Sequence, residues 1–110
     1  MQRGVYMYYT TERSDSNIRY NYTFENDTSC IFSVSKVGVI TILLKGYIPE
    51  ELLCEALSEV TNLTIQEGFT PKINIKNSNH FLRNVAKQCH YSKIPSYGIS
   101  FAIWTHPINS

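Results

Sequence analysis

Between residues 18 and 25 large apolar and polar side chains alternate without exception, and this alternation constrains the fold more than any other feature of the chain. The apolar positions are Ile18, Tyr20, Tyr22 and Phe24. Because successive side chains of a β-strand point to opposite faces, the pattern predicts a strand with one buried and one solvated face.

The segments around this strand also have strand-like composition. Residues 4–11 are aromatic and β-branched, and residues 30–35 form a third candidate strand. Residues 39–45 are apolar at successive positions, which is typical of a central strand covered on both sides. We therefore expect the N-terminal part to be an antiparallel meander that ends in a buried strand.

The period of the pattern changes at Pro49. Proline suits the first turn of a helix, and Glu50 and Glu51 suit its positive end. Apolar side chains then recur at three- and four-residue spacing. They are Leu52, Leu53, Ala56, Leu57, Val60 and Thr64. Gly68 is a natural terminator, so the spacing predicts a helix over residues 49–67.

The remaining elements complete an α+β order. Residues 71–76 alternate as a strand, and the polar residues 77–79 precede a second helix. Residues 91–95 are expected to form a loop before a final strand over residues 97–104. The predicted order is β-β-β-β-α-β-α-β, with both helices packed on a mixed sheet. The length of 110 residues favours one domain, over residues 1–110.

Charge is divided unevenly along the chain although the net charge is only +1. Residues 1–67 hold all nine acidic side chains, whereas residues 68–110 hold five basic ones and no acid. On the first helix Glu51, Glu55 and Glu59 follow one another at four-residue spacing, away from the apolar stripe. This acidic ridge is either a solvated face or a docking surface for a basic partner.

Two other groups of side chains could bind a partner. Tyr6 and Tyr8 lie in the first strand, where outward-facing tyrosines either form a protein interface or pack across strands on a solvated sheet face. Four basic residues form the alternative, an anion or nucleic-acid surface that could equally be a solvated face. They are Lys72, Lys76, Arg83 and Lys87.

Motifs for catalysis, cofactors and metals are absent from the sequence. A ribonuclease-type hydrolase built on His80 and His106 is the enzymatic alternative. Cys30, Cys54 and Cys89 are an odd set without metal-ligand spacing, and we expect structural thiols. These residues predict no cofactor, no metal and no enzymatic activity.

The acidic helix over residues 49–67 is similar to that of small bacterial immunity proteins of the contact-dependent-inhibition or colicin type. This resemblance implies an antitoxin-like inhibitor that occludes the active site of a cognate toxin, with the ridge replacing phosphates if that toxin is a nuclease. Glu51, Glu55 and Glu59, helped by Tyr6 and Tyr8, would then contact the partner. The start of the chain has no signal-peptide pattern and no apolar run could span a bilayer, which favours a cytoplasmic protein.

Overall fold

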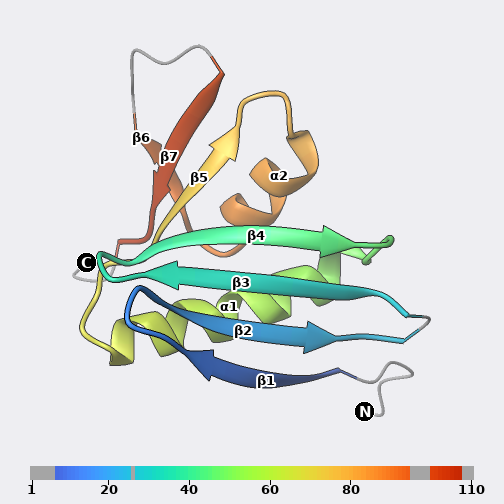
Figure 1. Ribbon diagram of the computed structural model, residues 1–110. Coiled ribbons are helices and arrows are strands. Elements are labelled where there is room, and N and C mark those ends of the chain that lie inside the picture. Colours follow the sequence, from blue (N-terminus) through green and yellow to red (C-terminus); the bar gives the residue numbers. More distant parts are fainter. Residues whose placement is uncertain (1–6, 26, 95–99, 108–110) are drawn as a thin grey trace.

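The computed structural model describes residues 7–25, 27–94 and 100–107. They form one seven-stranded mixed sheet and two helices (Figure 1). In chain order the elements are β1 (Tyr8–Arg13), β2 (Asn17–Thr23), β3 (Ser29–Ser35), β4 (Val39–Lys45), α1 (Glu50–Gln66), β5 (Lys72–Lys76), α2 (His80–Gln88), β6 (Ser92–Ile94) and β7 (Phe101–Thr105). The α+β class is confirmed, and the predicted order gains one strand, β6.

The first four strands form the expected antiparallel meander. Tyr20 of β2 pairs with Phe32 of β3, which pairs with Ile42 of β4. The predicted alternation in β2 is confirmed, because its apolar side chains are buried beneath α1 whereas Arg19 is exposed. Arg13 of β1 also forms an ion pair of 2.5 Å with Glu67 at the end of α1.

The sheet changes character between β4 and β5, its one parallel pair of strands within the described residues. Only Val39–Lys72 and Ile40–Ile73 are paired, and the two strands then diverge (Figure 1). β5 pairs with β7, and β7 with β6, so the strand order is β1-β2-β3-β4-β5-β7-β6. The helices that follow β4 and β5 therefore both begin on the side where these strands separate.

Both helices have defined ends. α1 starts after Pro49, as predicted, and α2 starts after Asn79, whose side chain accepts a hydrogen bond from the Leu82 amide. Both end in the same motif, in which one residue adopts a left-handed conformation. That residue is Gly68 after α1, with φ +95°, and His90 after α2, with φ +69°.

The core lies between the helices and one face of the sheet. It contains Phe32, Ile40, Leu53, Leu57 and Ile73, each fully buried. The opposite face is open, so the prediction that β4 is covered on both sides is wrong: Leu43 is 64% exposed. Among the described residues no helix is both long and apolar enough to cross a membrane.

Candidate functional site

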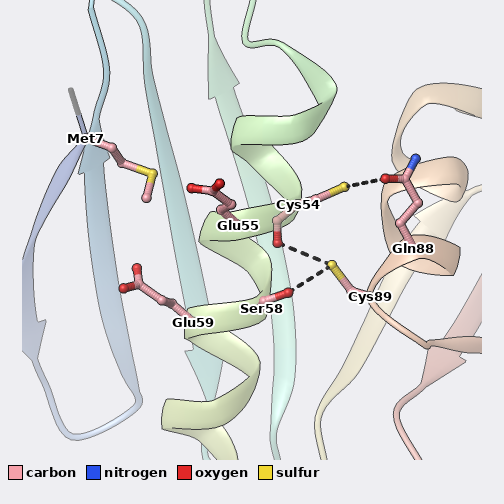
Figure 2. A pocket seen from close by; sticks show the side chains of 7 residues that line it. All are labelled: Met7, Cys54, Glu55, Ser58, Glu59, Gln88 and Cys89. Carbon is pink, nitrogen blue, oxygen red and sulfur yellow. Dashed lines mark hydrogen bonds between the residues drawn. The ribbon is translucent and has the colours of Figure 1, made fainter. Parts of the chain in front are cut away.

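A groove runs along the exposed side of α1, between this helix, the end of α2 and the start of β1. Its volume is about 500 Å³. We call it the carboxylate groove, and it is lined by Met7, Cys54, Glu55, Ser58, Glu59, Gln88 and Cys89 (Figure 2). Two glutamates of the predicted acidic ridge, Glu55 and Glu59, therefore line a concave surface rather than a projecting edge.

The three glutamates of the ridge have different surroundings. Glu51 is exposed in the first turn of α1, whereas Glu55 is half-buried. Glu59 accepts a hydrogen bond of 2.7 Å from the Tyr22 hydroxyl. In Figure 2 Glu55 and Glu59 both point to the side of α1 on which Met7 lies. Two of the three are thus positioned by the fold to face one ligand-sized space.

The side of the groove that lies between α1 and α2 holds two thiols (Figure 2). Cys54 Sγ donates to Gln88 Oε1 at 3.2 Å, and Cys89 Sγ donates to the Cys54 carbonyl at 3.4 Å. Burial raises the pKa of Cys54 to about 11 and also raises the pKa of Cys89. Because the thiolate is the nucleophile, both groups are poorly reactive at neutral pH. This agrees with the expectation of structural thiols.

The other predicted partner-binding residues lie elsewhere. Tyr8 is exposed on β1, and Tyr6 lies outside the described residues. The four basic residues do not form one surface. Lys72 and Lys76 alternate with buried isoleucines and therefore lie on the open face of the sheet, whereas Arg83 and Lys87 belong to α2 on the helical face. An anion site made from all four together is not present.

The predicted histidine pair is also separated. His80 begins α2, whereas His106 follows β7 and lies against the other end of that helix. The structure instead brings His106 close to His90. These two histidines line a cavity of about 210 Å³ together with Ser58, Thr61, Asn62 and Cys89, and we call it the histidine pocket. It shares Ser58 and Cys89 with the carboxylate groove.

Within the described residues no cluster of three or more histidine, cysteine, aspartate or glutamate side chains is arranged to hold a metal ion. The absence of a metal and of a cofactor remains a prediction from the sequence. The site therefore consists of two adjoining hollows with opposite character, one with carboxylates and one with imidazoles.

We compared the sequence and the fold with those of known proteins. No protein-family model and no curated protein matches the sequence. Two solved structures share the fold. One is described as an acetyltransferase from Sphaerobacter thermophilus, with a TM-score of 0.55 and 13% identity over 83% of this chain and 69% of that one. The other is the N-acetyltransferase PseH of Campylobacter jejuni in complex with acetyl coenzyme A, with a TM-score of 0.56 and 13% identity over 84% and 68%.

This chain has the fold of acetyltransferases. The finding overturns the immunity-protein interpretation, together with its toxin partner and the prediction of a non-enzymatic protein, because both of these solved structures are described as acetyltransferases. The prediction from the acidic helix was wrong because charge spacing does not reveal that Glu55 and Glu59 line a groove. The nucleic-acid and ribonuclease alternatives do not fit either, since their basic residues and histidines are split between distant parts of the fold.

Proposed function

We propose that this chain is an enzyme of the acetyltransferase type, which moves an acetyl group from a thioester donor to an amine. One observation carries the proposal: the strand order β1-β2-β3-β4-β5-β7-β6, with a helix after β4 and another after β5, superposes on two acetyltransferases over more than four fifths of the chain. Fold alone does not define a reaction, because the reaction depends on the side chains at the site.

The divergence of β4 from β5 gives the donor a place to bind. Ligands of open sheets bind where adjacent parallel strands separate at their carboxyl ends. Here the two strands separate after Ile40 and Ile73, and Ile42 and Leu44 beyond this point are only partly buried. An extended thioester could lie along these apolar side chains.

Acetyl coenzyme A, the ligand of PseH, also carries phosphates, and the helix starts beside the diverging strands do not fit them. Helix N-termini bind phosphate through free backbone amides and a positive field. At α1, Glu50 and Glu51 place two carboxylates in the first turn. At α2, the Leu82 and Arg83 amides already donate to Asn79. We therefore assign no step of the reaction to coenzyme A, and we expect a donor without the nucleotide to serve as well.

The carboxylate groove gives the acceptor its character. Glu55 and Glu59 lie on the same side of α1, and Glu59 is held by the Tyr22 hydroxyl. No lysine or arginine lines the groove among the described residues. Carboxylates paired with an ammonium group form hydrogen bonds about twice as strong as neutral ones, so the groove favours a cationic amine.

The test supplies the purified chain with acetyl coenzyme A or with the nucleotide-free thioester S-acetyl-N-acetylcysteamine. The acceptors are a diamine, a polyamine and a neutral alcohol, and release of free thiol is followed. We expect thiol release that depends on the amines and not on the alcohol. Glu55→Gln combined with Glu59→Gln raises the KM for the amine about tenfold, equivalent to about 1.4 kcal/mol.

The matched control is Glu25→Gln, which removes an exposed carboxylate in the turn after β2, outside the groove. Its kinetic constants should equal those of the unmodified protein. Amine-independent thiol release, or none from either donor, would refute acetyl transfer. An equal rise of KM in both variants would refute the assignment of the acceptor to the groove.

A further inference from the structure

The histidine pocket has a set of groups that the proposed acetyl transfer does not use. It lies where three elements meet: α1 contributes Ser58, Thr61 and Asn62, the end of α2 contributes His90, and the segment after β7 contributes His106. Its volume of about 210 Å³ exceeds the roughly 30 Å³ that one water occupies in the liquid. A ligand of several heavy atoms can therefore enter.

His90 occupies a backbone position that a glycine would fill at lower cost. Its amide donates to the Lys87 carbonyl, and the Tyr91 amide donates to the Ala86 carbonyl. These two bonds define the glycine-favouring end motif that Gly68 forms after α1. A left-handed conformation is unfavourable for a residue with a Cβ atom. Strain of this kind is typical of functional positions, and here it places an imidazole at the pocket.

His106 is fixed from several sides. Its backbone amide donates to the Pro71 carbonyl at 3.1 Å. Its ring lies 5.2 Å from the ring of Tyr91, whose hydroxyl is 2.6 Å from Thr61 Oγ1. The Nδ1 atom of His106 is buried and has no hydrogen-bond partner among the described residues. Buried polar atoms normally have partners, so this nitrogen can form a hydrogen bond with a bound water or with a ligand group.

The residues that line the pocket favour a ligand with negative charge. Its polar side chains are hydroxyls, an amide, a thiol and two imidazoles, and no carboxylate lines it within the described part of the chain. The neighbouring Cys89 and Tyr91 both have raised pKa values and are uncharged at neutral pH. Burial, and then the proximity of His90, lower the pKa of His106. An anion would offset both effects by stabilising the protonated imidazoles.

We propose that the histidine pocket binds a small oxyanion, a phosphate or a carboxylate, between His90 and His106. This binding site adjoins the carboxylate groove, with which it shares Ser58 and Cys89, but anion binding there does not depend on the proposed reaction. Protonation of the two imidazoles should be coupled to binding, because two cationic rings beside one another are tolerated only when an anion lies between them.

The test is a proton NMR titration of the histidine ring protons of the full chain, between about pH 5 and pH 8. It is done without added anion, with inorganic phosphate and with sodium acetate. We expect an anion to raise the pKa of His106 and to shift the ring-proton signals of His90, whereas the ring-proton signals of His80 should not respond to the anion. His90→Gly and His106→Gln should each weaken binding about tenfold or more, a loss of about 1.4 kcal/mol. His80→Gln is the matched control.

The two anions distinguish the sources of the ligand. A response to phosphate alone assigns the pocket to phosphorylated ligands, and a response to acetate alone assigns it to carboxylates. His90→Gly also relieves the backbone strain, so this variant should fold and still lose binding. The proposal is overturned if neither anion moves the His106 titration, or if His90→Gly binds the anion as tightly as the unmodified protein.

Discussion

The phenol of Tyr22, on the buried face of β2, donates a hydrogen bond of 2.7 Å to Oε1 of Glu59 on α1. Tyr22 is 1% exposed and stacks on Tyr9 of the edge strand. Burial, and then this hydrogen bond, raise the pKa of its hydroxyl. One side chain therefore joins the edge of the sheet, the core and the wall of the carboxylate groove.

Removing this hydroxyl should cost stability. In Tyr22→Phe the aromatic packing stays, while a hydrogen bond to a charged group is lost, and such bonds contribute roughly 1.5–3 kcal/mol. We expect the free energy of unfolding, measured in urea, to fall by about 1.5 kcal/mol. Tyr47→Phe is the control, because Tyr47 is 79% exposed. Equal stability of the two variants would show that the Tyr22–Glu59 bond does not form.

Replacing His90 with glycine should stabilise the fold. Glycine adopts the left-handed conformation freely, so His90→Gly should raise the free energy of unfolding by roughly 1 kcal/mol. The reverse change is the control: Gly68→Ala, at the same position after α1, should lower it by a similar amount. No described atom lies within 4 Å of a Cβ placed at Gly68, so only the backbone conformation opposes the change. A loss of stability in His90→Gly would show that the left-handed conformation of His90 does not destabilise the fold.

Because of His106, the free energy of unfolding should fall in mild acid. Its pKa in the folded chain lies below the ordinary 6.5, so the unfolded chain binds more protons over this range. Stability therefore rises with pH there. The contribution is fully present above about pH 6.5 and is lost as the pH falls through the lower, folded value.

In His106→Gln this pH dependence should diminish, whereas His80→Gln should keep it. Unfolding in urea at several pH values between about 5 and 8 provides the comparison. If His106→Gln and the unmodified protein lose stability in parallel as the pH falls, the burial of His106 is wrongly assigned.

The acidic start of α1 should weaken the binding of a donor that carries a nucleotide. Glu50→Gln combined with Glu51→Gln removes two negative charges from the first turn. We expect the KM for acetyl coenzyme A to fall severalfold while the KM for S-acetyl-N-acetylcysteamine stays the same, because only the former carries phosphates. Equal changes for both donors would place the phosphates away from α1. The same variant should be slightly less stable, since carboxylates favour a helix N-terminus.

Much of the fold followed from local patterns. The alternation from Ile18 to Phe24 identified the buried face of β2, and Pro49 and Gly68 marked the ends of α1 correctly. β6 was missed because three residues carry too little pattern to be recognised as a strand. The exposed face of β4 was misjudged because an apolar side chain such as Leu43 looks the same in sequence whether or not a second layer covers it.

The site was less accessible to sequence reasoning, because its residues meet only through long-range packing. The spacing of Glu55 and Glu59 was visible, but the Tyr22 hydroxyl comes from β2 and Met7 comes from the residue before β1, both far away in the chain. His106 reaches His90 because β7 pairs with β5. One signal was available: a histidine stood where the end of a helix favours glycine.

The mass of an amine acceptor after incubation with the chain and a thioester donor tests the central claim most directly. If the chain is an acetyltransferase of the proposed type, the amine gains one acetyl group at a rate that depends on Glu55 and Glu59. If the amine gains no more acetyl group than in the uncatalysed reaction with either donor, the claim is wrong, whatever the likeness of the fold.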